Sequence, residues 1–339
     1  QPVDLGGIPT DVQVDDFDGD GAIDAAFVLQ QDSACTVLFG DGAGGFPAQR
    51  TFFFPNDATP SFLLKGDIDG DGDQDLLEYN GFSGGTIHTI INEGDRSFTT
   101  FAAQALNESA FLLAALGDLD GDNRADLVYA KRGVFSLADL VVRLGAGDGT
   151  FLPKAQQLPL SFNPAQLTIT DMNGDDAPDA LYVDFDLIRG TAVLLNQTPV
   201  AAPGAFALTS PPDGSTGLSL PKELAGWPSG EGEALVQWEP ALGFAVRYTL
   251  TVAEDAALSQ VVLQQGGLAK PRFVLPQGLL RPGRTYFWSV AATNSAGQTP
   301  ALAGPFSFST RFSADIDGDG VVGPGDLFLL LGSWGQPQP

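Results

Sequence analysis

The chain has 339 residues, enough for two or three domains, and 43% of them are hydrophobic, so a packed core is expected and wholesale disorder is not. Its formal net charge of −26 argues against nucleic acid and anionic membranes as partners and favours a cation. Aspartate supplies 34 of the 42 acidic residues, and 42 glycines and 24 prolines indicate the many turns of an all-β protein.

Four acidic nonapeptides recur in the first part of the chain, each between two short apolar runs of strand type. They are DFDGDGAID from Asp16, DIDGDGDQD from Asp67, DLDGDNRAD from Asp118 and DMNGDDAPD from Asp171, and they start 51, 51 and 53 residues apart. Glycine-rich stretches such as LFGDGAGGF (38–46) follow, and three of the repeats then continue into a further strand. Four short strands per unit at a nearly fixed period predict the blades of a propeller or of another β-array.

The acidic loops have the chemistry of calcium sites. Residues 1, 3 and 5 of a tight loop can direct their side chains at one centre, and Ca²⁺ takes roughly six to eight oxygen ligands. We predict one ion per loop, bound by the side chains at positions 1, 3, 5 and 9 and by the carbonyl at position 7. Position 6 is Gly21, Gly72, Asn123 or Asp176, residue types that tolerate a left-handed backbone. A solvated acidic turn without an ion is the alternative interpretation. The predicted ligands are Asp16, Asp18, Asp20, Ala22 and Asp24; Asp67, Asp69, Asp71, Asp73 and Asp75; Asp118, Asp120, Asp122, Arg124 and Asp126; and Asp171, Asn173, Asp175, Ala177 and Asp179. We expect the last of these loops to be the weakest site, because Asn173 removes one charge.

The acidic loops and the LFGDGAGGF stretch resemble the FG-GAP/VCBS repeats of integrin-α-type β-propellers over roughly residues 1–200. The resemblance implies a propeller-like domain at 1–198, with four repeats where such propellers usually have seven blades. Repeat four runs into a linker at 199–205 without a clear outer strand of its own. Residues 1–10 are candidates for that strand, either closing the array within one chain or completing the edge of a neighbouring copy in a fibre. A frayed terminus is the third alternative.

Residues 206–311 lack acidic loops and alternate apolar and polar residues in runs such as RYTLTVAED (247–255). GLLRPGRTYFWSV resembles the E–F corner of a fibronectin type III or immunoglobulin-like sandwich. The resemblance implies that Trp238 is a core tryptophan and that Tyr286 bonds through its hydroxyl group to backbone near Leu280.

The last segment, 312–339, contains DIDGDGVVGPGD, which begins like the loop at Asp67 but has EF-hand spacing. It predicts a fifth calcium site, followed by a short apolar helix, and resembles one half of a dockerin module. The helix either docks on the chain's own sandwich or inserts into a neighbour. The predicted ligands are Asp315, Asp317, Asp319, Val321 and Asp326.

Cys35 is the only cysteine, so no intrachain disulfide can form, and its apolar surroundings predict a core residue. No apolar run is long enough to span a membrane. The chain starts at Gln1 without methionine, as a processed protein does, and we expect it to be secreted and located at the cell surface.

The sequence offers no recognisable catalytic set, because its only histidine, His88, lies in a strand-like run. We therefore expect a non-catalytic, extracellular structural or adhesion protein with about five bound Ca²⁺ ions. Its expected partners are further copies of itself, joined by strand donation into a surface filament, or a cell-surface or glycan ligand. The alternatives are a carbohydrate-binding module, with Tyr79, Phe82 or Trp227 as exposed aromatics, a dockerin-bearing accessory component of a polysaccharide-degrading complex, and an accessory domain of a larger enzyme.

Overall fold

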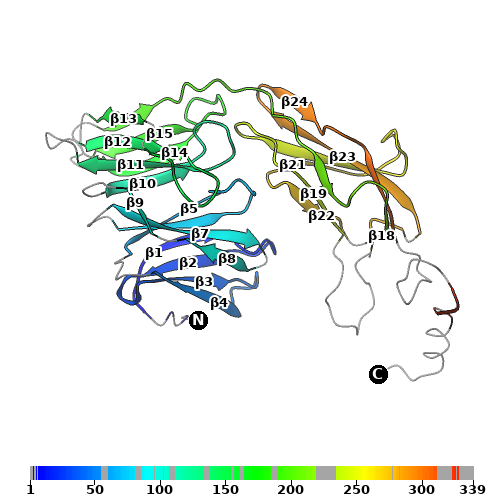
Figure 1. Cartoon of the computed structure of the whole chain (residues 1–339), viewed down its shortest axis with the longest axis horizontal. Helices are drawn as coiled ribbons and strands as arrows, with labels where there is room; N and C mark the ends of the chain where they lie inside the picture. The colour runs from blue at the N-terminus through cyan, green and yellow to red at the C-terminus, as the bar shows by residue number, and fades with distance from the viewer. Residues whose placement is uncertain are drawn as a thin grey trace. The chain divides into compact units, whose positions relative to one another are not determined.

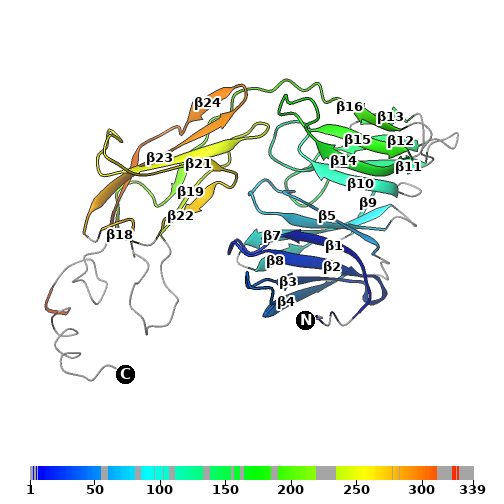
Figure 2. The same cartoon turned by 180° about the vertical axis from the view of Figure 1, so that it is seen from behind.

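The computed structural model describes residues 3–310, apart from 4, 6, 55–59, 81–84, 95, 102, 107–110, 133–137, 154–155, 161–163, 185–189, 219–233, 277 and 282, together with 323–325 and 327. Over these residues the protein is all-β and consists of several mainly antiparallel sheets, none of which closes into a barrel (Figures 1 and 2). The only helical segments described are a 3-10 turn, η1 (Gln30–Asp32), and a helical backbone at residues 324, 325 and 327. No described helix is long and apolar enough to cross a membrane.

The chain divides into two compact units. The first, residues 1–200 with 243–245, contains four sheets, which we call repeat sheets 1 to 4 because an acidic loop joins the first two strands of each. Repeat sheet 1 contains β1 (Pro9–Asp15), β2 (Asp24–Leu29), β3 (Ala34–Phe39) and β4 (Ala48–Phe53). Repeat sheet 2 contains β5 (Phe62–Gly66), β6 (Asp75–Tyr79), β7 (Thr86–Gly94), β8 (Ser97–Thr100) and β9 (Gln104–Ala105). Repeat sheet 3 contains β10 (Phe111–Gly117), β11 (Asp126–Arg132), β12 (Ala138–Arg143) and β13 (Gln156–Pro159), and repeat sheet 4 contains β14 (Pro164–Thr170), β15 (Asp179–Asp184) and β16 (Thr191–Leu194).

The repeat sheets pack face to face in chain order, and we call each packed interface a join. Their first strands lie next to one another, β1 against β5, β5 against β10 and β10 against β14. Val37 and Phe39 of repeat sheet 1 pack with Leu63 and Phe98 of repeat sheet 2 in the first join. Cys35 is fully buried in the same cluster, as expected of a core residue. Because strand side chains alternate between faces, an interior repeat sheet buries both of its faces.

Repeat sheet 4 differs from the others because it ends at β16, whereas β4, β8 and β13 are outer strands of the other three. The sequence indicated that repeat four lacks an outer strand, and none is described. A hollow of about 560 Å³ lies beside β16, lined by Leu144, Leu158 and Leu194 among others. The expectation for residues 1–10 is wrong in part, since Pro9 and Thr10 belong to β1 and no described residue of this segment pairs with β16. Strand β1 continues to Asp15 and pairs with β2, so it is the first strand of repeat sheet 1.

The second unit, residues 201–242 with 246–339, contains two sheets. Strands β17 (Leu208–Ser210), β19 (Leu235–Trp238) and β22 (Arg272–Val274) form the smaller sheet. The larger sheet contains β18 (Ser215–Leu218), β20 (Arg247–Ala253), β21 (Val261–Leu268), β23 (Thr285–Asn294), β24 (Gly297–Pro300) and β25 (Phe306–Thr310). Strands β18 and β25 are parallel, and the other pairs of this unit are antiparallel.

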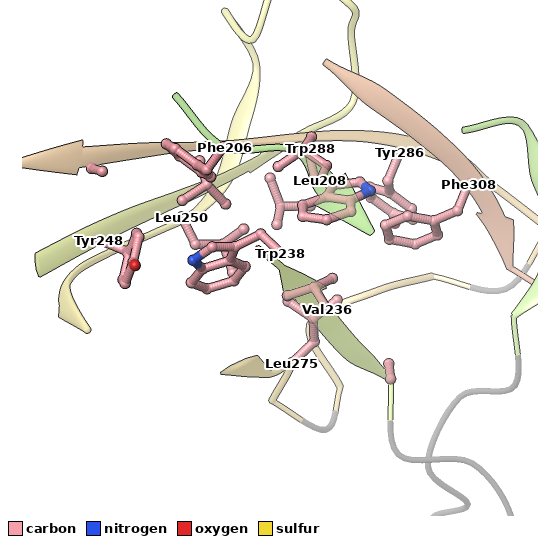
Figure 3. Close-up of a cluster of buried hydrophobic side chains, with 14 of the residues drawn as sticks. Phe206, Leu208, Val236, Trp238, Tyr248, Leu250, Leu275, Tyr286, Trp288 and Phe308 are labelled. Carbon is pink, nitrogen blue, oxygen red and sulfur yellow. The ribbon is translucent and has the colours of Figure 1, made fainter. Parts of the chain in front are cut away.

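Side chains from both sheets of the second unit share one apolar core (Figure 3). Trp238 of the smaller sheet and Trp288 of the larger sheet are both buried in it. The Tyr286 hydroxyl group accepts a hydrogen bond of 2.8 Å from the backbone N–H of Arg281, next to the position expected from the sequence. This contact ties the loop before β23 to the core.

The predicted fifth calcium loop cannot be placed, because Asp315, Asp317, Asp319, Val321 and Asp326 lie outside the described residues. The same holds for most of the helix expected after it, of which only residues 324, 325 and 327 are described.

Candidate metal sites in the acidic loops

The four described acidic loops share one hydrogen-bonded frame, built on the aspartate at position 9. In repeat sheet 2, Asp75 accepts hydrogen bonds from the N–H groups of Ile68 at 2.6 Å and Asn92 at 2.7 Å, so it ties the loop to the end of β7. We call such a residue a frame aspartate; all four are buried and accept two equivalent bonds. They are Asp24, bonded by Phe17 and Gly40, Asp75, Asp126, bonded by Leu119 and Gly145, and Asp179, bonded by Met172 and Asn196.

The aspartate at position 1 closes each loop onto itself. Asp67 accepts N–H bonds from Gly70 at 2.8 Å and from Gly72 at 3.0 Å. Position 6 has a positive φ in every described loop, including 67° at Asn123 and 72° at Asp176, as predicted from the residue types.

The position-7 amide donates to the position-5 carboxylate in each loop. The donor–acceptor pairs are Ala22 with Asp20 at 2.7 Å, Asp73 with Asp71 at 2.8 Å, Arg124 with Asp122 at 2.9 Å, and Ala177 with Asp175 at 2.9 Å. These bonds hold the loop in a tight coil around its acidic side chains.

Carboxylate oxygens converge in three of the loops. In each of three groups, one oxygen per residue lies within 4.8 Å of the oxygens of the other two, which is close enough for a shared ion. The groups are Asp16, Asp18 and Asp24 in loop one, Asp67, Asp69 and Asp71 in loop two, and Asp118, Asp120 and Asp122 in loop three. Hard oxygen donors at this spacing suit Ca²⁺.

The electrostatics of the ion-free loops support the same conclusion. Burial, followed by repulsion from Asp71 and Asp69, raises the pKa of Asp67 to about 7, against the opposing effect of its backbone hydrogen bonds. Burial and repulsion from neighbouring carboxylates likewise raise the pKa of Asp118 to about 6. In loop one, Oδ1 of Asp16 is buried without a hydrogen-bond partner. The described residues therefore fit a hard divalent cation, which would favour the charged carboxylates.

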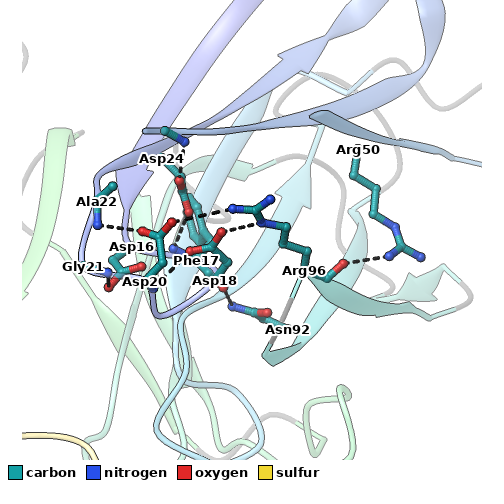
Figure 4. A network of polar contacts seen from close by, with 11 residues as sticks. Asp16, Phe17, Asp18, Asp20, Gly21, Ala22, Asp24, Arg50, Asn92 and Arg96 are labelled. Carbon is teal, nitrogen blue, oxygen red and sulfur yellow. Dashed lines mark hydrogen bonds and ion pairs between the residues drawn. The ribbon is translucent and has the colours of Figure 1, made fainter. Parts of the chain in front are cut away.

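Loop one also contains a cationic contact that the sequence analysis missed. Arg96, from the turn between β7 and β8, places Nε 2.5 Å from Oδ2 of Asp18 and a second nitrogen 3.6 Å from Asp20 (Figure 4). Its guanidinium carbon lies 4.9 Å from the ring centre of Phe39. Arg96 is separated from Asp18 by 78 residues, so only the tertiary structure brings them together. Loop one is thus partly neutralised by the protein itself.

Loop four is the most open of the described loops. Asp171, Asn173 and Asp175 are all exposed, and the Asn173 side-chain amide donates to Asp175 at 2.8 Å. Among the described residues, no group of three metal-binding side chains forms there. The prediction that this site is the weakest stays a prediction, and the exposure supports it.

The single histidine lies in a different environment from the loops. Nδ1 of His88 lies 2.8 Å from Oε2 of Glu78, and both side chains are buried in the first join. Tyr79, one of the three aromatics considered for glycan binding, is only 4% exposed, which argues against that role. The other two, Phe82 and Trp227, lie outside the described residues.

Comparison with protein families identifies the repeats. The model of the FG-GAP-like repeat matches residues 16–78 and 118–182. Both segments begin at a position-1 aspartate, and together they span all four described acidic loops. No curated protein matches the sequence. The chain therefore contains FG-GAP-like repeats, in agreement with the resemblance of its acidic loops.

Proposed function

We propose that the protein is a non-catalytic, calcium-stabilised structural protein whose four repeat sheets form a propeller-like array. The observation that carries the proposal is the convergence of three carboxylate groups on one point in each of loops one to three, with at most one of the three exposed in any loop. A bound ion would remove the repulsion that raises the pKa of Asp67, and would offset two of the 26 net negative charges. The frame aspartates would then hold the ion-binding residues in place, and in loop one Asp24 would also be a ligand itself.

We further propose that the protein works outside the cell, at the cell surface. Calcium modules of the extracellular space bind with dissociation constants of about 10⁻⁴–10⁻³ M, so loops of modest affinity would hold calcium there. The second unit, with its two-sheet core and buried Tyr286, is proposed to be a fibronectin III-like spacer or binding module. The segment after it would add a fifth, dockerin-like calcium loop.

Metal analysis combined with thermal unfolding tests calcium binding. If only the folded state binds, each tenfold excess of free calcium over the dissociation constant adds about 1.4 kcal/mol of stability per site. We expect at least three ions per chain by mass spectrometry under native conditions, and a melting temperature many degrees higher in calcium than in chelator. Magnesium at equal concentration should stabilise less, because it demands rigid octahedral geometry. Less than one bound ion, or equal melting temperatures, would exclude the proposal.

Two variants with opposite expectations sharpen this test. Asp120→Asn removes a proposed ligand from loop three and should lower the calcium stoichiometry by one. Asp148→Asn alters an exposed turn aspartate whose carboxylate is bonded to Thr150, outside the acidic loops, and should leave the stoichiometry unchanged.

A further inference from the structure

The three joins within the chain use equivalent positions, which the frame aspartates define. The frame aspartate of each sheet pairs with the last residue of the first strand: Asp15, Gly66, Gly117 or Thr170. Three residues before these lie Val12, Leu63, Ala114 and Leu167. Leu63 is buried against repeat sheet 1, Ala114 is buried against repeat sheet 2, and Leu167 packs against the cluster that contains Val128 of repeat sheet 3. This position therefore faces the preceding repeat sheet.

Repeat sheet 1 has no preceding sheet among the described residues, and its face is open along β1, whereas Leu38 of β3 on the same face is buried. Val12 is 46% exposed and Val14, on the same face, is 53% exposed. The residues paired with them on β2 are also apolar; Phe27 is half-buried and Ala25 is buried. We call this surface the leading face. It carries no charged side chain at the four positions named, although the chain as a whole has 42 acidic residues.

Repeat sheet 4 exposes the opposite half of a join. Leu195 lies just before Asn196, whose N–H donates to the frame aspartate Asp179. Phe39 has the equivalent position in repeat sheet 1, just before the residue that donates to Asp24. Phe39 is buried in the first join, but Leu195 is 52% exposed. Gln166 and Thr168 of β14 are exposed on the same face. We call this surface the trailing face; it is also uncharged at these positions.

The first join shows how a trailing face contacts a leading face. Oδ2 of Asp11 accepts a hydrogen bond of 2.9 Å from the backbone N–H of Leu63, and the Gln13 side chain donates one of 2.8 Å to the Leu63 carbonyl. The equivalents of Asp11 and Gln13 in repeat sheet 4 are Gln166 and Thr168, which are again polar. The equivalent of Leu63 in repeat sheet 1 is Val12.

We propose that the trailing face of one copy packs on the leading face of a second copy, in the register of the three internal joins. This inference rests on the proposed propeller-like array but does not require calcium at any particular loop. The inner strands β1 and β14 expose these faces in the same chain, so the described chain does not close on itself there. Two copies joined at both ends would bring eight repeat sheets together, within the four to eight blades of closed propellers. If the rotation per sheet does not close the ring, the same head-to-tail contact gives a filament.

A pair of cysteines tests the register. In the chain carrying both Val12→Cys and Gln166→Cys, the new thiols stand where Leu63 and Asp11 meet in the first join. Mild oxidation in calcium buffer should convert most of the protein into disulfide-linked dimers or longer chains on a denaturing, non-reducing gel. Cys35 is buried and should not react. Each single variant, and Gln166→Cys combined with Leu302→Cys at a position that is 71% exposed, should stay monomeric.

Only monomers in the double variant would overturn the proposal. If those monomers contain an internal disulfide, the chain closes on itself instead. Equal crosslinking in the Leu302 control would show random collision and would also count against the join.

A charge pair provides a second, independent test. In the first join, Lys65 Nζ lies 2.5 Å from Oδ2 of Asp15. The equivalent positions at the proposed contact are Val14 of one copy and Thr170 of the other. We expect sedimentation of the unaltered protein to give at least twice the 35.4 kDa chain mass. Val14→Asp should weaken association at least tenfold. Val14→Asp combined with Thr170→Lys should restore most of the association.

Monomers at all concentrations, or a double variant as weak as Val14→Asp alone, would refute the inference. Calcium titration of the same samples keeps the two proposals apart. Ion binding without association removes only the join, and association without ion binding removes only the calcium sites.

Discussion

Replacing Asp75 by alanine separates the frame role of an acidic loop from its proposed ligand role. The variant leaves the N–H groups of Ile68 and Asn92 without an acceptor, and both residues are fully buried. Each unsatisfied buried donor costs about 1–3 kcal/mol. Burial raises the pKa of Asp75 to about 8 in the ion-free protein, so removing this carboxyl group also relieves a desolvation cost. The net loss should be about 2–4 kcal/mol, which lowers the melting temperature of a unit this size by about 5–15 °C.

The matched variant is Asp69→Asn in the same loop. Asp69 accepts a long hydrogen bond of 3.2 Å from the N–H of Asp71, and its oxygen belongs to the proposed metal group. Calorimetry or circular dichroism should show that the Asp75 variant loses stability both in calcium and in chelator. Asp69→Asn should lose stability in calcium alone, since in chelator it relieves repulsion between carboxylates. If both variants lose stability only in calcium, the division between frame and ligand is wrong.

Three further predictions concern the buried groups. In chelator, the free energy of unfolding measured in urea should fall as the pH rises from 4 to 8. A pKa of about 7 at Asp67 and at Asp126 makes the folded chain bind more protons than the unfolded chain in this range. Saturating calcium should reduce this slope, and a rise of stability with pH in chelator would contradict the prediction. His88→Leu should cost about 3–5 kcal/mol by leaving the buried Glu78 without its ion-pair partner, and adding Glu78→Leu should recover most of the loss in calorimetry. A loss that persists in the double variant would rule out this cause. Tyr286→Phe should lower the free energy of unfolding of the second unit alone by about 1–2 kcal/mol, which calorimetry would record as a shift of one transition. The absence of a shift would show that the hydroxyl hydrogen bond does not stabilise the unit.

The acidic loops were predictable because their information is local. Positions 1 to 9 are consecutive, and their alternation of aspartate and glycine determines both the turn and the direction of the carboxylates. The second role of Asp75 was not predictable in the same way. Its two partners lie 7 and 17 residues away, and the bond to Asn92 requires the end of β7 to lie beside the loop. A carboxylate in an acidic motif resembles a ligand in sequence even where it supports the backbone.

Contacts between repeats were harder to predict than the repeats themselves. The pairing of Arg96 with Asp18 depends on the turn between β7 and β8 reaching the loop of the preceding sheet. In the other repeats the corresponding stretches read GDGAGGF and GAGDGTF, without an arginine, so periodicity alone gives no signal. The candidate outer strand at residues 1–10 overlapped β1 for a related reason, because the sequence does not show that β1 already begins at Pro9.

The arrangement of the repeat sheets determines where the protein depends on its surroundings. A stacked repeat is stabilised mainly by its immediate neighbours, so an interior sheet gains two joins and a terminal sheet gains one. Repeat sheet 4 has one described join, no described outer strand and the exposed loop with Asn173, whereas repeat sheet 2 has two joins and the buried pair of Glu78 and His88. Calcium in loops one to three would stabilise individual sheets, but it cannot cover the trailing face at Leu195. A second copy would cover it, which is why the proposed ions and the proposed contact stabilise different parts of the same array.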